Sequence, residues 1–165
     1  MVDLATIHLI PTLLVFAGML PVYVAVTRPG GDIGWLTDIA FVVGLAAAIL
    51  ELVADVQMHR FVRDRRDDQA MDRGLWSWSR HPNYFFEWFG WLAYPLLAID
   101  FSGVYPWGFA ALLGPACMYW LLVYVSGIPP LEAHMLERRR DEFRAYQART
   151  SAFFPVPSRA FQGSK

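Results

Sequence analysis

The sequence has little cysteine and little charge for a chain of 165 residues. A single cysteine, Cys117, excludes an internal disulfide framework and any zinc or iron–sulfur site built from several cysteines. Charged side chains make up 18% of the chain and the net charge is −1, so the basic surface that nucleic acid requires is missing. The sequence therefore predicts no disulfide-stapled fold and no nucleic-acid partner.

Several common catalytic and processing motifs are absent as well. The chain contains no G-x-G-x-x-G, no P-loop, no H-E-x-x-H and no G-x-S-x-G. The four histidines (His8, His59, His81 and His134) are not spaced as zinc ligands, so no metal site is expected. The start has no basic region or small-residue cleavage site, which argues against a cleavable signal peptide. Without an internal repeat or flexible linker, residues 1–165 are predicted to form a single domain.

Apolar side chains are abundant, at 56% of the chain with a mean hydropathy of +0.32. A helix needs about 20 mostly apolar residues to cross the hydrocarbon of a bilayer. Four segments meet or approach this length: 4–27, 35–56, 84–101 and 105–125. The sequence predicts an all-α integral membrane bundle of about four transmembrane helices.

The basic residues predict the orientation of this bundle. Thirteen of the fourteen lysines and arginines lie either in the loop 57–83 or after Leu131. Two predicted spans separate these segments, which therefore fall on the same side of the membrane. The excess of positive charge in cytoplasmic loops makes that side cytoplasmic, together with both termini.

A shorter amphipathic helix is expected after the fourth span. Residues 126–130 (Ser-Gly-Ile-Pro-Pro) are predicted to break the helix, and a new helix is predicted over 131–148. On a helical wheel, Glu132 and Arg139 share the apolar arc of this helix, which also contains Leu131, Met135, Phe143 and Tyr146. We expect this arc to dock on an apolar surface with both charged groups turned inward, whereas Arg138 and Arg140 are solvated or lie on anionic lipid.

Ionisable groups inside predicted spans need a partner or a wet cavity. Glu51 and Asp55 are four residues apart on one helix face, and Asn83 and Glu87 repeat this spacing. Glu51 and Asp55 either line a cytoplasmic pocket or mark a helix end at the lipid headgroups. Asn83 and Glu87 either line an interior cleft or form a polar contact between two helices. Just before the third span, Arg80 and His81 offer an anion-binding fork and a titratable ring, for a ligand or for lipid headgroups.

Three blocks of sequence resemble a known family. The string Asp72 to Glu87 (DRGLWSWSRHPNYFFE) resembles the core motif of the steroid 5-alpha-reductase-like membrane family, and most of all its uncharacterised bacterial branch. The blocks 51–57 (ELVADVQ) and 126–132 (SGIPPLE), with 146–155 near the end, agree with this resemblance. Arg-His-Pro-x-Tyr alone is less specific, because isoprenylcysteine carboxyl methyltransferases share it.

The resemblance implies a reductase of lipid metabolism in a bacterial inner membrane. It would bind NADPH in a cytoplasm-facing cavity and reduce the C=C bond of a lipophilic, enone-containing substrate among membrane lipids to CH–CH. The positions expected at the cofactor are Asp55, Arg80, His81, Asn83, Glu87, Glu132, Arg139 and Tyr146. No acid for the substrate carbonyl can be assigned by motif, and Tyr84 and Tyr94 are the candidates.

Full-length reductases of that family have several more helices at the N-terminus, and these carry the Glu and Tyr that polarise the substrate carbonyl. The chain is thus expected to be a minimal member, a fragment, or a protein that works with a partner subunit or further copies of itself. Two other functions fit the same residues. One is an S-adenosylmethionine-dependent membrane methyltransferase, and the other is a non-catalytic lipid-binding or assembly module.

Overall fold

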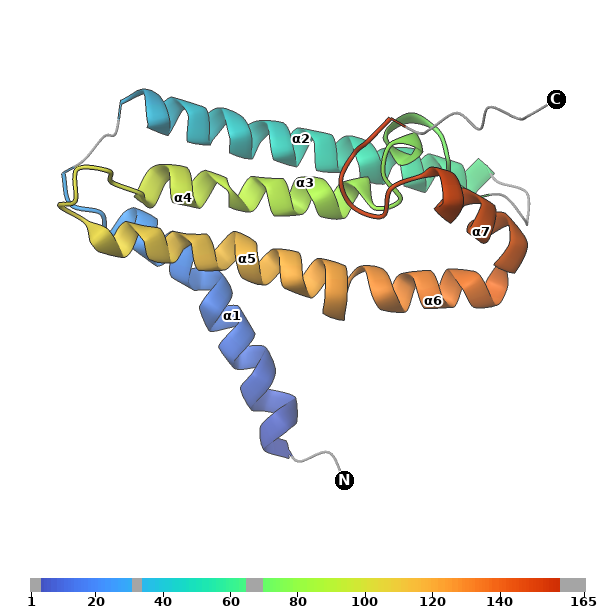
Figure 1. Ribbon diagram of the computed structural model, residues 1–165, viewed down its shortest axis with the longest axis horizontal. Helices are drawn as coiled ribbons and strands as arrows, with labels where there is room; N and C mark the ends of the chain where they lie inside the picture. Colours follow the sequence, from blue (N-terminus) through green and yellow to red (C-terminus); the bar gives the residue numbers. More distant parts are fainter. Residues whose placement is uncertain (1–3, 31–33, 65–69, 158–165) are drawn as a thin grey trace. The chain divides into compact units, whose positions relative to one another are not determined.

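The computed structural model describes residues 4–30, 34–64 and 70–157, with side chains from Val15 onward. These residues form helices, and no strand occurs among them (Figure 1). The helices are α1 (Leu4–Val26), α2 (Trp35–Asp64), α3 (Pro82–Trp91), α4 (Ala93–Ala98), α5 (Leu113–Trp120), α6 (Ile128–Arg138) and α7 (Arg140–Arg149). Three short turns complete them: the 3₁₀ turns η1 (Gly74–Ser77) and η2 (Pro106–Leu112) and the π turn η3 (Leu121–Val125).

The chain divides into two compact units. Unit 1 contains residues 1–46 and 88–120, and unit 2 contains residues 47–87 and 121–165. Helices α2 and α3 each contribute residues to both units. The predicted orientation in the membrane rests partly on basic residues at 65–69 and beyond position 157. These residues lie outside the described part of the chain.

Unit 1 is held together by small side chains. Its buried core is Val24, Ala98 and Ala111, with Leu20 and Tyr105 packed against it. A Cβ added at Gly114 would collide with the Pro21 ring, and one at Gly108 would collide with the Ala98 carbonyl. The close approach of α1 to α5, and of η2 to α4, therefore depends on glycine in these two places.

Within the part of the chain that the structure describes, two helical stretches are long and apolar enough to cross a membrane. They are Trp35–Asp64, which is 30 residues long, and Pro106–Arg138, which is 33 residues long. The expected third span is instead divided at Leu92 into α3 and α4. Pro95 explains this break, since proline has no N–H to donate to the carbonyl four residues earlier.

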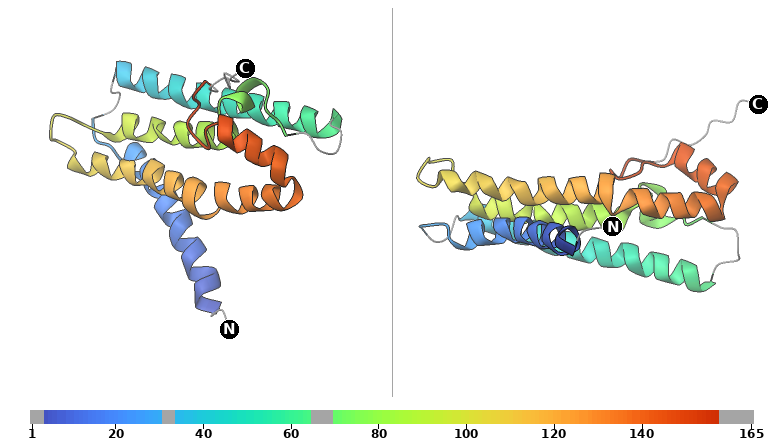
Figure 2. Two further views of the ribbon diagram at one scale, coloured as in Figure 1. Left: turned by 45° about the vertical axis from the view of Figure 1, so that its right-hand side comes forward. Right: turned by 90° about the horizontal axis from the view of Figure 1, so that it is seen from below.

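The expectation of one continuous helix over 131–148 is wrong. The helix starts earlier, at Ile128, because Pro129 and Pro130 occupy its first turn, where proline is tolerated. It then ends at Arg138, because the next residue, Arg139, has a φ of −144° and a ψ of 49°, which are not helical. Figure 2 shows α7 turning back from the end of α6. Glu132 and Arg139 consequently do not share one helical arc.

Candidate functional site

The segment before α3 is fastened to α2 within unit 2. Gly74 has a φ of +59°, which glycine adopts without strain, and starts the turn η1. The Leu75 N–H donates to Gln57 Oε1 (3.0 Å), and the indole N–H of buried Trp76 donates to the Ala54 carbonyl (3.0 Å). These bonds fix the start of residues 72–87, the motif segment, which contains Arg80 and His81.

The chain after α7 pairs with the same segment. Ser79 and Ser151 form an isolated parallel bridge, in which the Arg80 N–H donates to the Ser151 carbonyl (2.8 Å). The Ser79 hydroxyl, fully buried, donates to the Phe153 carbonyl (2.8 Å). The motif is thus held from both sides, by α2 and by the C-terminal segment.

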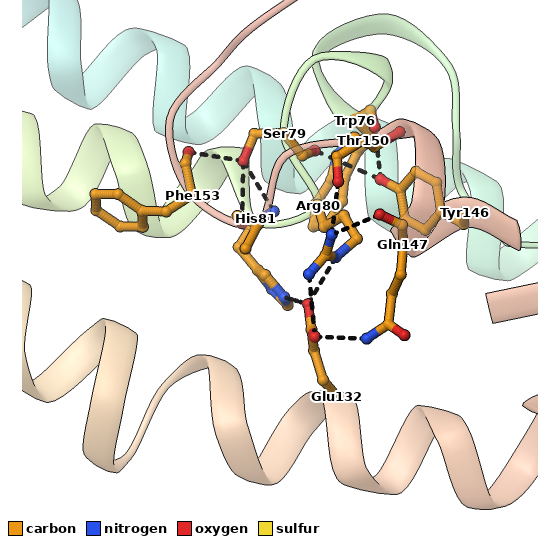
Figure 3. Close-up of polar contacts among 10 residues, drawn as sticks. Trp76, Ser79, Arg80, His81, Glu132, Tyr146, Gln147, Thr150 and Phe153 are labelled. Atoms are coloured by element: carbon orange, nitrogen blue, oxygen red, sulfur yellow. Dashed lines mark hydrogen bonds and ion pairs between the residues drawn. The ribbon is translucent and has the colours of Figure 1, made fainter. Parts of the chain in front are cut away.

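A buried ionic cluster centres on Glu132 of α6 (Figure 3). Arg80 donates to its carboxylate through Nε (2.7 Å) and Nη2 (3.2 Å), and Gln147 of α7 donates from Nε2 (2.7 Å). Arg80 Nη1 also donates to the Thr150 carbonyl (2.6 Å). The Arg80 and Glu132 side chains are 11% and 13% exposed, so this two-point ion pair is largely shielded from water. The cluster ties α6, α7 and the motif segment together.

His81 belongs to the same cluster. It is 4% exposed, and its Nε2 lies 3.0 Å from Glu132 Oε1. Its ring stacks on Tyr84, with 5.6 Å between centroids and 11° between planes. Its Nδ1 is buried and has no hydrogen-bond partner among the described residues.

Tyr146 of α7 anchors the fold through its hydroxyl. This hydroxyl donates to the Trp76 carbonyl (2.5 Å), and the residue is 3% exposed. Burial raises the pKa of the Tyr146 hydroxyl well above its usual range, so the hydroxyl keeps its proton and remains a donor.

A cavity of about 290 Å³ lies within unit 2. Five of the residues expected at a cofactor line it: Arg80, His81, Asn83, Arg139 and Tyr146. The rest of the lining is mostly apolar and comes from Met58, Phe61, Val62, Ala70, Met71, Trp76, Leu131, Met135 and Phe143. Residues of α2, the motif segment, α6 and α7 therefore meet around one space, although they are up to 88 positions apart in sequence.

The remaining expected residues lie outside this lining. Asp55 of α2 accepts a hydrogen bond from the Asn83 amide (3.1 Å), which connects it to the cavity wall. Glu87 is partly buried and interacts electrostatically with Glu51 and Asp55. Glu132 supports the wall through Arg80 and His81.

The two candidate acids belong to different units. Tyr84 stacks on His81 in unit 2, whereas Tyr94 packs its ring on Trp91 in unit 1, with 5.5 Å between centroids. Gln147 and the apolar lining of α2 belong to the site but were not predicted from the sequence. Gln57, which accepts a hydrogen bond from η1, lies within block 51–57. The resemblance of that block to the family was the feature from which its role could have been predicted.

Comparison with known proteins places the chain in a family but names no activity for it. The sequence profile described as "Protein of unknown function (DUF1295)" matches residues 1–150, which is most of the chain. No curated protein and no solved structure matches the chain. The chain belongs to the DUF1295 family.

Proposed function

We propose that this chain is a membrane-embedded, NADPH-dependent reductase of a lipid-like enone. The observation that carries the proposal is the cavity of unit 2, where the motif residues Arg80, His81 and Asn83 line one space with Arg139. Two helical stretches of membrane-spanning length support the membrane location. The resemblance of segments 51–57, 72–87 and 126–132 to the steroid 5-alpha-reductase-like family supports the reaction class.

The residues of the cavity fit part of a dinucleotide. Its volume of about 290 Å³ is near the lower end of small-molecule sites, which suits one ring system with its neighbouring phosphate. Trp76, Met58 and Phe61 offer an apolar wall for a ring, and the Arg139 guanidinium offers a charge for a phosphate. His81 Nδ1, which has no partner among the described residues, offers a further polar contact to a ligand.

Bound NADPH would supply a hydride to the β-carbon of the enone. The side chains of the chain would bind and orient. The Asn83 amide, held by Asp55, presents a fixed polar group at the wall. The ion pair of Arg80 with Glu132 keeps α6 and the motif segment together, so the wall retains its shape. Tyr84, stacked on His81, is the candidate acid nearest to these groups.

A titration of the detergent-purified chain tests this proposal. Energy transfer from tryptophan to the nicotinamide reports NADPH binding, and isothermal titration calorimetry reports the binding of S-adenosylmethionine, which has no nicotinamide. We expect NADPH to bind. Glu87→Gln should weaken that binding, because Glu87 interacts with Asp55, the residue that holds the Asn83 amide. Glu137→Gln, on the exposed face of α6, should not. If the parent binds no NADPH, the reductase proposal is wrong. If the two variants bind NADPH equally, the proposed role of Glu87 is wrong.

An S-adenosylmethionine-dependent methyltransferase is the second candidate, and the charge distribution favours it. Three carboxylates, Glu51, Asp55 and Glu87, interact with one another in unit 2, and acidic groups suit a cationic sulfonium. Arg80, which was expected to neutralise phosphates of a dinucleotide, is also engaged by Glu132 and by backbone carbonyls. Binding of S-adenosylmethionine without NADPH would select this function. Binding of neither would select the lipid-binding or assembly module.

A further inference from the structure

The imidazole of His81 lacks one partner that a buried ring needs. The residue is 4% exposed, and Nδ1 makes no hydrogen bond within the part of the chain that the structure describes. Buried polar atoms nearly always have a partner, and an unpaired one costs roughly 1–3 kcal/mol. His81 also lines the cavity, so a molecule bound there could reach the ring.

The contact with Glu132 determines which hydrogen bond Nδ1 can make. An ionised carboxylate only accepts hydrogen bonds, and Glu132 already accepts from Arg80 and Gln147. The hydrogen between His81 Nε2 and Glu132 Oε1, 3.0 Å apart, is therefore carried by Nε2. In a neutral imidazole the other nitrogen is then an acceptor. Nδ1 is consequently a buried acceptor that needs an N–H or O–H donor.

The ring is also fixed in place before any ligand arrives. Tyr84 stacks on one face of the ring. Glu132 holds Nε2, and the backbone N–H of His81 donates to the Ser79 hydroxyl (3.1 Å) (Figure 3). A group held by such supporting contacts loses little conformational freedom when it binds a ligand. The arrangement resembles the supporting shell that sets the tautomer of a functional histidine.

We propose that Glu132 is a positioning residue that keeps His81 in the Nε2–H form, so that Nδ1 accepts a hydrogen bond from an N–H or O–H group of the ligand. The choice of NADPH as probe rests on the proposed function, and the carboxamide or amino groups of that molecule belong to the required donor class. Glu132 thus acts on the ligand through His81, in contrast to the expectation that it contacts the cofactor itself.

Two substitutions at one position separate the two nitrogens. The glutamine amide reaches about as far as Nε2, so His81→Gln keeps the contact with Glu132 and removes the acceptor at Nδ1. The asparagine amide sits near Nδ1, so His81→Asn keeps a polar group there and removes the contact with Glu132. We expect His81→Gln to retain the parent melting temperature and to lose roughly tenfold in NADPH affinity. His81→Asn should melt lower and lose less affinity. His134→Gln, at an exposed position of α6, is the control and should change neither.

Nitrogen-15 NMR of histidine-labelled protein reads the tautomer directly. The His81 signals are assigned by their loss in His81→Gln. We expect a ligand-free parent with hydrogen on Nε2 and none on Nδ1, and a shift of the Nδ1 signal when NADPH is added. In Glu132→Gln the preference for one tautomer should weaken. Hydrogen on Nδ1 in the ligand-free parent would overturn the inference, and so would equal NADPH affinity of His81→Gln and the parent.

Failure of the proposed function has a different signature. If the parent binds S-adenosylmethionine but no NADPH, the reductase proposal falls, and the same variants titrated with S-adenosylmethionine decide the role of His81. If the parent binds neither molecule, the ligand contact at Nδ1 is overturned together with the reductase, whatever tautomer the spectrum shows.

Discussion

Arg80 illustrates how one side chain can stabilise the site without reaching into it. Its planar guanidinium donates to two oxygens of Glu132 and to the Thr150 carbonyl at once. A lysine carries a compact charge and cannot reproduce this geometry. Arg80 therefore serves as a clamp between α6 and the segment after α7, and the phosphate contact expected for it stays a prediction.

Arg80→Lys should lower the stability of the chain. We expect a loss of roughly 1.5–3 kcal/mol, the usual range for hydrogen bonds to charged groups, because Glu132 and the Thr150 carbonyl lose donors in a largely buried place. The melting temperature in detergent measures this effect. Arg73→Lys is the matched control, since Arg73 is exposed, and it should melt like the parent. Equal melting temperatures of the two variants would contradict this stabilising role of Arg80.

The turn η1 is the element that most depends on a single residue. Gly74 combines a φ of +59° with a close neighbour, because an added Cβ would lie 2.6 Å from Gln57 Oε1. This oxygen accepts the Leu75 N–H, so a shift of Gln57 would also weaken the attachment of η1 to α2. A side chain at position 74 is thus opposed by conformation and by space together.

Gly74→Ala should therefore destabilise more than alanine at another positive-φ glycine. Gly30 and Gly103 have φ values of +101° and +82°, with nothing within 4 Å of an added Cβ. Gly30→Ala and Gly103→Ala measure the conformational cost alone, which is roughly 1 kcal/mol. We expect the melting temperature of Gly74→Ala to fall clearly below that of both controls. If all three variants melt together, the contact with Gln57 is unimportant.

The break between α6 and α7 gives Arg139 a different role from its neighbours. Arg139 lies at the break and lines the cavity, whereas Arg138 and Arg140 are exposed and do not line it. A charge near a bound phosphate contributes to affinity, and an exposed charge contributes almost nothing. Arg139→Ala should lower NADPH affinity severalfold, while Arg138→Ala and Arg140→Ala should leave it within error. If all three variants bind NADPH with equal affinity, Arg139 does not contact the ligand.

At the level of elements, the sequence predicted the helices better than their ends. Long apolar runs are sufficient to predict α1 and α2, since a run of that length has few other structures available. The break at Arg139 has no local signal, because arginine is a good helix former and the non-helical backbone there is not required by its own residue type. The inward position of Glu132 was predicted from a helical wheel that assumed one continuous helix. The position is correct, although the assumption of one helix is not.

The site was predictable as a list of residues but not as a set of contacts. Motif spacing selected Arg80, His81 and Asn83, all of which line the cavity. The pairing of Arg80 with Glu132 joins residues 52 positions apart, and no short-range pattern encodes such a pair. The apolar wall of α2 was equally hidden, because Met58 and Phe61 resemble ordinary lipid-facing or core residues in the sequence.

For the whole molecule, the prediction still to be tested is the orientation in the membrane. Thirteen basic residues lie in two segments separated by the predicted third and fourth spans, which places both segments and both termini in the cytoplasm. The loop 101–104 between these spans should lie on the opposite side, and it contains Gly103, where an added Cβ meets nothing within 4 Å. The segment 82–98 is broken at Leu92, and at 1.5 Å per residue its helices reach about 25 Å, somewhat less than the thickness of the hydrocarbon. The third span is therefore the span whose crossing of the membrane most needs a test.

A reporter active only in the cytoplasm is fused to each terminus and, in a third fusion, inserted after Gly103. We expect activity at both termini and none after Gly103, with the reverse pattern for a reporter active only outside the cytoplasm. If segment 82–98 does not cross, the Gly103 insertion will be active in the cytoplasm, because the loop then stays on the side of residues 57–83. Cytoplasmic activity there would reduce the number of spans and overturn the orientation of the C-terminal half, whereas silence confirms that a helix broken at Leu92 still crosses the bilayer.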